Sequence, residues 1–111
     1  MELNTKFDSK QYDAMLDSNT AMLVYFFQDN CSVCTGLSLK VKELIEQDFS
    51  KMELVFLDAF ENRALAAQIR MMSIPGIMVY IEEREFFRAN GLIGLGELKN
   101  KIERYYLLIF G

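Results

Sequence analysis

Seven consecutive apolar residues, Ala21–Phe27, constrain the fold of this 111-residue chain more than any other feature. The run has the aromatic and aliphatic chemistry of a β-strand, and it is far shorter than the ~20 residues that a membrane-spanning helix needs. A strand with one face in water would alternate apolar and polar residues, and this run does not. The pattern therefore predicts a central strand that is covered on both faces.

Helices and strands are expected to alternate along the rest of the chain. Before the apolar run, Gln11 stands three residues after Asp8, an arrangement typical of a capping box at the start of a helix that ends within residues 17–20. The other predicted elements are strands at residues 3–7, 53–59, 77–81 and 86–89, and helices at residues 32–47, 61–70 and 95–106.

The connections between these elements predict the fold class. Residues 82–85 form a charged turn that is too short for a crossover, so the last two strands should form an antiparallel hairpin. The earlier strands are separated by helices, which is typical of parallel crossovers. The expected fold is therefore a single α/β domain, residues 1–111, with a mixed central sheet of parallel strands plus a C-terminal antiparallel hairpin and helices on both faces.

Composition narrows the classes of function. Apolar residues make up 51% of the chain, which excludes intrinsic disorder. The net charge of −4 and the lack of a basic run make nucleic acid and membrane surfaces poor partners. Residues 1–8 have no apolar core of the kind found in signal peptides, so a cytoplasmic location is expected. In that reducing compartment a structural disulfide is less expected than a working pair of thiols.

The only two cysteines, Cys31 and Cys34, lie where the central strand gives way to a helix. At a helix N-terminus the unpaired N–H groups and the macrodipole favour a thiolate, the nucleophile of thiol–disulfide exchange. Ser32 and Val33, in the same first turn, are expected to support that thiolate. An alternative is a pair of unreactive thiols on a binding domain. No metal site is expected, because zinc needs four ligands and the chain has two Cys and no His, unless two copies share their cysteines.

The C-x-x-C pair at the start of the second helix, followed about forty residues later by Ile74 and Pro75, resembles the thioredoxin family. The resemblance covers nearly the whole chain and implies the thioredoxin fold. It implies that Cys31 is the attacking thiolate and Cys34 the buried resolving thiol. It also implies that Pro75 is a cis proline whose loop faces the cysteines and, with Ile74 in an extended conformation, pairs with the backbone of a bound substrate.

Several positions depart from the family pattern. Most thioredoxins bury an acidic residue on the strand before the motif, where this chain has Tyr25, and the residue after the proline is Gly76 instead of Thr. A tyrosine, with an ordinary pKa near 10, is not a base at neutral pH. The resemblance therefore predicts slower resolution of mixed disulfides than in relatives that carry the acid.

The function expected from these features is that of a thiol–disulfide oxidoreductase. Its partners would be protein disulfide substrates and a reductase or other thiol electron donor, it would need no cofactor, and it would act as a monomer. The alternative is a non-catalytic adaptor that binds a partner protein through the groove beside Pro75, and a third possibility is a dedicated partner of one enzyme such as a peroxidase. The apolar stretch at residues 105–110 is expected to be the buried end of the last helix, with self-association as the alternative.

Overall fold

The computed structural model describes residues 2–3, 8–28 and 32–111, with backbone only at residues 2–3 and 32–35. The elements follow the expected order β-α-β-α-β-α-β-β-α. They are β1 (Glu2–Leu3), α1 (Ser9–Ser18), β2 (Ala21–Phe27), α2 (Ser32–Asp48), β3 (Glu53–Asp58), α3 (Arg63–Gln68), β4 (Gly76–Ile81), β5 (Arg84–Asn90) and α4 (Leu95–Phe110).

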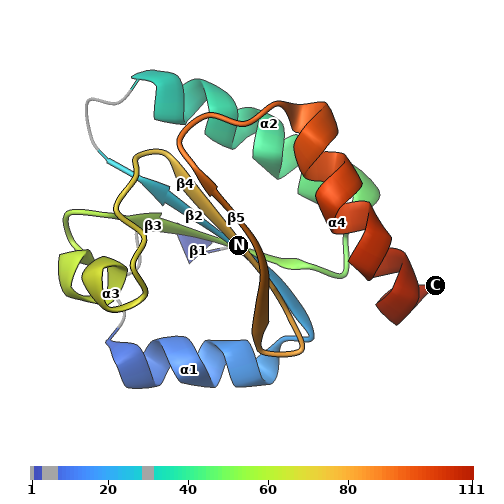
Figure 1. The fold of residues 1–111 in the computed structure, drawn as a ribbon, viewed down its shortest axis with the longest axis horizontal. Helices are drawn as coiled ribbons and strands as arrows, with labels where there is room; N and C mark the ends of the chain where they lie inside the picture. Colours follow the sequence, from blue (N-terminus) through green and yellow to red (C-terminus); the bar gives the residue numbers. More distant parts are fainter. Residues whose placement is uncertain (1, 4–7, 29–31) are drawn as a thin grey trace.

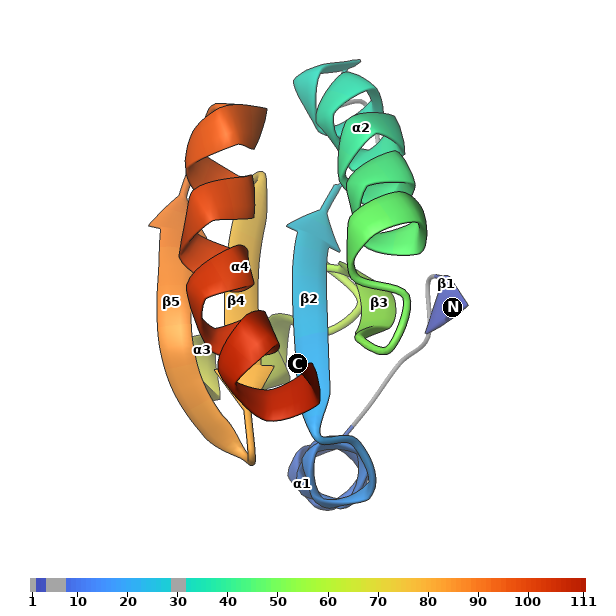
Figure 2. The ribbon, with the colours of Figure 1, turned by 90° about the vertical axis from the view of Figure 1, so that its right-hand side faces the viewer.

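The five strands form one mixed sheet in the order β1-β3-β2-β4-β5. Strands β1, β2 and β3 run parallel, whereas β4 is antiparallel to both β2 and β5. Figures 1 and 2 show α2 and α4 on one face of this sheet and α1 and α3 on the opposite face. The predicted fold class is confirmed.

The central strand β2 contributes to a separate core on each face. Leu23 and Tyr25 pack in the cluster under α2 and α4, whereas Met22, Val24 and Phe26 pack in the cluster under α1 and α3. All five side chains are fully buried. Because successive side chains of a strand point to opposite faces, only a continuously apolar run can occupy this position.

Helix α1 begins with the capping box that the sequence predicts. The Asp8 carboxylate accepts a hydrogen bond from the Gln11 backbone N–H at 2.8 Å, and the Asp8 N–H donates to the Gln11 side chain at 2.9 Å. The two contacts satisfy backbone donors that a helix start otherwise leaves unpaired.

Two predictions concern the ends of the chain. Strand β1 is observed at Glu2–Leu3, and most of its expected range, residues 4–7, lies outside the described residues. Helix α4 continues past the predicted segment 95–106 to Phe110, as expected for the apolar stretch at residues 105–110, and Tyr106 packs on Phe49 and on Phe110 at ring distances of 5.0 and 4.6 Å. The last turn is not buried throughout, since Leu107 and Leu108 are exposed.

The hairpin turn is shorter than predicted. Only Glu82 and Glu83 form it, both with positive φ (50° and 68°), which is the geometry of a two-residue hairpin connection. Arg84 and Glu85, expected in a solvated turn, lie in β5. A register shift then follows, because Tyr80 faces Glu85 while Val79 faces Phe87, so one extra residue bulges from β5.

Helix α3 ends in a Schellman motif with an arginine at the left-handed position. The Met71 N–H bonds to the Ala66 carbonyl at 2.9 Å and the Arg70 N–H to the Ala67 carbonyl at 3.1 Å, with Arg70 at φ 59°. Glycine usually occupies this position because its lack of a Cβ removes the steric cost of positive φ.

Arg70→Gly is therefore expected to stabilise the protein by roughly 0.5–1 kcal/mol, despite the greater freedom of glycine in the unfolded chain. The measurement is the free energy of unfolding in urea, with Arg104→Gly in the middle of α4 as a control that should destabilise by about 1 kcal/mol. A loss of stability in Arg70→Gly would mean that the contacts of the arginine side chain stabilise the protein by more than its left-handed backbone conformation destabilises it.

Candidate thiol–disulfide site

Helix α2 begins at Ser32, as predicted, so Ser32, Val33 and Cys34 form its first backbone turn. The side chains of residues 32–35 are not described, and Cys31 lies outside the described residues. The predicted roles of Cys31 and Cys34, and the support by Ser32 and Val33, therefore stay predictions. The described part of the site consists of the start of this helix and the segments around it.

The sheet register brings those segments to one edge. At the carboxyl end of β2, Phe26 pairs with Gly76 of β4 and Phe27 pairs with Asp58 of β3. The loop after β3 therefore begins, and the loop before β4 ends, at the edge where the chain leaves β2 for α2. This edge is where ligands of open α/β sheets bind, outside the carboxyl ends of the parallel strands.

The peptide bond between Ile74 and Pro75 is cis. Pro75 is buried, and its carbonyl accepts a hydrogen bond from the Gly91 N–H at 2.9 Å. Ile74 is half-buried, and its own backbone N–H and C=O form no hydrogen bond with any other residue that the structure describes. Backbone groups that make no such bond can pair with a peptide strand.

A groove of about 210 Å³ lies beside Ile74. Its walls come from the end of β2, the loop after β3, helix α3 and the loop before β4, and they comprise Gln28, Ala59, Phe60, Arg63, Ala66, Met71, Met72 and Ile74. Phe60 and Met72 are strongly exposed for apolar side chains, at 61% and 77%. The Arg63 guanidinium lies over the Phe60 ring at 4.9 Å, so the groove carries a positive charge at its aromatic wall. Such a surface suits an apolar peptide side chain.

A second hollow of about 460 Å³ lies on the other side of α2. It is lined by Gly36, Leu37 and Lys40 of α2 and by the loop residues Leu92, Ile93 and Gly94. Leu92 is 69% exposed. This hollow therefore places an exposed apolar side chain of the loop before α4 beside α2.

Tyr25 is buried beneath α2, with its ring 5.5 Å from that of Phe56. Burial raises the pKa of Tyr25 to about 12, because the low-dielectric core disfavours the phenolate. The Asp58 carboxylate, at the same edge of the sheet, is already bonded to the backbone N–H groups of Phe60 and Glu61 at 2.8 and 3.1 Å. Tyr25 is therefore no base at neutral pH, and Asp58 caps its own turn.

The raised pKa of Tyr25 makes stability depend on alkaline pH. The folded state holds the phenol proton of Tyr25 more tightly than the unfolded state does. The contribution of this group to the free energy of unfolding is therefore complete below pH 10 and is lost as the pH rises from 10 toward 12. At pH 11 the expected loss is about 1 kcal/mol relative to pH 8.

Tyr25→Phe should remove this contribution to the loss of stability between pH 8 and pH 11. Urea unfolding at the two pH values measures the free energy of unfolding. Tyr105→Phe, which alters a half-exposed tyrosine of α4, is the matched control and should leave the loss in place. An identical pH profile for wild type and Tyr25→Phe would contradict the assignment.

Arg88 and Glu85 of β5 are residues near the site that the sequence pattern did not single out. The Arg88 guanidinium forms a bidentate ion pair with Glu85 and also donates to the carbonyls of Ile69 and Arg70, the two residues after α3. On a regular strand, residues three apart point to opposite faces, so the pair is not expected from spacing. The bulge at β5 restores them to one face, and no signal in the sequence marks that bulge.

Among the described residues, no group of three His, Cys, Asp or Glu side chains could hold a metal ion. The described helices include none that is both long and apolar enough to span a bilayer.

The strand order, the helix that starts within a C-x-x-C pair and the cis proline before β4 together define a protein of the thioredoxin fold. The family model Thioredoxin matches residues 4–104. The chain belongs to the thioredoxin family.

Its relatives are distant. Over 98 residues the chain is 28% identical to a thioredoxin of Synechocystis, a match that covers 88% of this chain and 92% of that protein. It is 23% identical over 88 residues to the thioredoxin-like protein YdfQ of Bacillus subtilis, covering 79% of this chain and 78% of that protein. Among solved structures, a mutant thioredoxin from Halobacterium salinarum superposes with a TM-score of 0.81 at 26% identity, covering 95% of this chain and 91% of that one.

Proposed function

We propose that residues 1–111 form one thioredoxin-like domain that reduces protein disulfides through Cys31 and Cys34. The observation that carries the proposal is the cis bond between Ile74 and Pro75 at the edge where α2 begins, with an Ile74 backbone that forms no hydrogen bond to any described residue. Membership of the thioredoxin family supports the same activity.

The proposed reaction has two exchange steps. The Cys31 thiolate attacks one sulfur of a substrate disulfide, forms a mixed disulfide and releases the other substrate sulfur as a thiolate that takes a proton. Cys34 then attacks the Cys31 sulfur, which forms a Cys31–Cys34 disulfide and releases the second substrate thiol. Two electrons pass to the substrate, and a reductase or another thiol protein returns them. The chain's own residues need no cofactor for these steps.

The positions around the cysteines have distinct parts in this scheme. The amino end of α2, formed by the backbone of Ser32 and Val33, lowers the pKa of the Cys31 thiol through its unpaired N–H groups. Ile74 pairs with the substrate backbone, while Phe60 and Met72 contact apolar side chains that flank the substrate disulfide. Because Tyr25 cannot accept the Cys34 proton, the second step is slow compared with relatives that carry an acid there.

Reduction of insulin disulfides by dithiothreitol, followed by turbidity, tests the activity. The protein should accelerate the reaction well above dithiothreitol alone. The competing function is a non-catalytic adaptor, which the exposed apolar groove beside Ile74 also suits. An adaptor would bind a peptide at the groove and leave the rate of insulin reduction unchanged.

In this proposal the protein is a cytoplasmic monomer. Its substrates are protein disulfides, and its electron donor is a reductase or another thiol protein. A dedicated role for one enzyme, such as a peroxidase, is a narrower form of the same activity. Capture of substrates from a cell extract by a Cys34→Ser variant distinguishes the two, since a dedicated partner would trap one protein and a general reductase many.

A further inference from the structure

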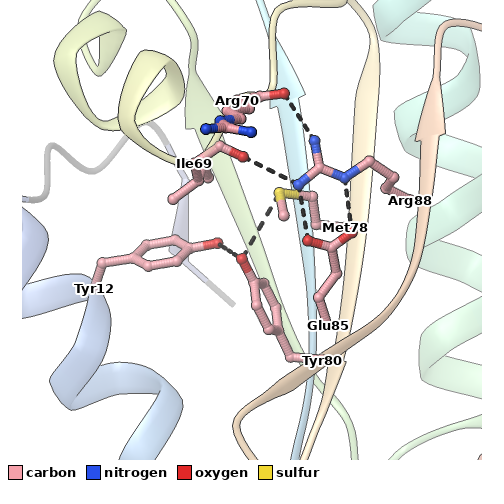
Figure 3. Close-up of polar contacts among 7 residues, drawn as sticks. All are labelled: Tyr12, Ile69, Arg70, Met78, Tyr80, Glu85 and Arg88. Carbon is pink, nitrogen blue, oxygen red and sulfur yellow. Dashed lines mark hydrogen bonds and ion pairs between the residues drawn. The ribbon is translucent and has the colours of Figure 1, made fainter.

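The Arg88 guanidinium of β5 makes four hydrogen bonds, two to Glu85 and two to the carbonyls of Ile69 and Arg70, directly after α3 (Figure 3). Its Nε and Nη2 donate to the two oxygens of Glu85 at 2.7 and 2.8 Å. Its Nη1 donates to the Arg70 carbonyl at 2.7 Å and its Nη2 to the Ile69 carbonyl at 3.0 Å. The Arg88 side chain is 26% exposed, and its bond to the Ile69 carbonyl is partly buried. A planar guanidinium can make all four contacts at once, and a lysine ammonium cannot.

The bulge in β5 makes the arrangement possible. Glu85 faces Tyr80 and Arg88 faces Met78 across the β4–β5 ladder, so both side chains lie on the face that carries α1 and α3. Tyr80 in turn accepts a hydrogen bond from Tyr12 of α1 at 3.0 Å, beside the guanidinium (Figure 3). Without the extra residue, Glu85 would point to the opposite face.

Strand β5 and the residue directly after it, Gly91, consequently hold both ends of the segment that carries the cis proline. At one end, Arg88 binds the carbonyl of Arg70, directly before Met71. At the other end, the Gly91 N–H binds the Pro75 carbonyl at 2.9 Å. The left-handed conformation of Arg70 costs energy for a residue with a Cβ, and such a conformation persists only where its surroundings hold it.

We propose that Arg88, oriented by Glu85, is a positioning residue that holds the segment from Met71 to Pro75 in the conformation that pairs with substrate. The proposal rests on the proposed function, because it takes the backbone of this segment to pair with a substrate. Arg88 contacts neither substrate nor thiol. Its effect is on the fraction of molecules in which Ile74 is ready to pair.

This role predicts an effect on substrate binding and none on the thiol. If the segment is released, only part of the population binds substrate, and the apparent affinity falls by that fraction. The Cys31 thiolate depends on the amino end of α2, which lies on the opposite face of the sheet from α3 (Figure 2). Its pKa and reactivity are expected to stay unchanged.

The experiment compares Arg88→Met with Arg84→Met, which removes the same charge from an exposed position of the same strand. Arg88→Met should raise KM for insulin about fivefold with little change in kcat, whereas Arg84→Met should leave both unchanged. The rate of Cys31 alkylation by iodoacetamide as a function of pH should be the same in all three proteins. Glu85→Gln keeps one acceptor oxygen and should give a smaller rise in KM.

Amide hydrogen exchange at Met71 and Gly91, whose N–H groups donate to the carbonyls of Ala66 and Pro75 at the two ends of the segment, gives a readout that does not need activity. Exchange there should be faster in Arg88→Met than in wild type or Arg84→Met. If wild type fails to reduce insulin while this difference is seen, the proposed function is wrong and the positioning of the segment stands.

An unchanged KM and unchanged exchange in a folded Arg88→Met protein would overturn the proposal. So would an equal loss of substrate affinity and of Cys31 reactivity, because that pattern indicates a general disturbance of the fold. If Arg88→Met does not fold, Glu85→Gln takes its place, and wild-type exchange and KM in that variant would also overturn it.

Discussion

Replacing Cys31 by serine is expected to reduce insulin turnover to the rate of dithiothreitol alone. A serine hydroxyl does not exchange with a disulfide. The one remaining thiol, that of Cys34, lies within α2 and not before its first residue. Turbidity of the insulin B chain measures the loss, and thermal unfolding checks that the variant is folded.

Cys34→Ser is the matched control for this prediction. It should lose turnover as well, but it should still attack substrate and accumulate a mixed disulfide through Cys31, which mass spectrometry detects. Turnover above background in Cys31→Ser, or mixed disulfides formed through Cys34 instead, would contradict the proposed order of attack.

Gly76→Ala is expected to destabilise the protein by about 2 kcal/mol, within the range for added volume in a packed site. A Cβ at this position would lie 2.5 Å from the Met71 sulfur and 2.8 Å from the Ser73 carbonyl oxygen. The methionine can rotate away, but the carbonyl belongs to the backbone of the cis-proline loop and can only move with it. Insulin reduction should therefore fall together with stability.

Gly36→Ala in α2 is the control, because a Cβ there meets no described atom from outside the helix backbone within 4 Å. In an exposed helix interior, alanine should stabilise by roughly 0.5–1 kcal/mol. The same chemical change thus has opposite signs at the two glycines, and urea unfolding measures both. A Gly76→Ala protein as stable as wild type would show that the cis-proline loop accommodates the added methyl group without a loss of stability.

The absence of a side chain at Gly76 also explains a departure from the family pattern. The thioredoxin resemblance leads one to expect Thr after the cis proline, and Met71 fills that space from the other side of the loop. The sequence alone shows the glycine but not the methionine that makes it necessary.

Short-range patterns predicted most of the fold correctly. The bounds of β2 and the first residue of α2 are observed as predicted, because a continuous apolar run and its break are local signals. The capping box of α1 is local as well, since its two partners are three residues apart. The cis bond before Pro75 was expected from the family resemblance, and no local pattern predicts it.

Long-range geometry was beyond the sequence pattern. Glu85 was expected in a solvated turn, yet it lies in β5 and orients Arg88, because a bulge changes which face each residue occupies. The continuation of α4 to Phe110 was expected from the apolar stretch at residues 105–110, but the contacts of Tyr106 with Phe49 and Phe110 were not.

By itself, the sequence determined the order of helices and strands, the covered position of β2 and the start of a helix at Ser32, because these depend on neighbours within a few residues. Only the tertiary structure decided the surroundings of the cis proline: an Ile74 backbone that bonds to no described residue, the groove beside it and the attachment of the cis-proline loop to β5. Those features depend on strand register and on one bulged residue, which shift every side chain from one face of the sheet to the other.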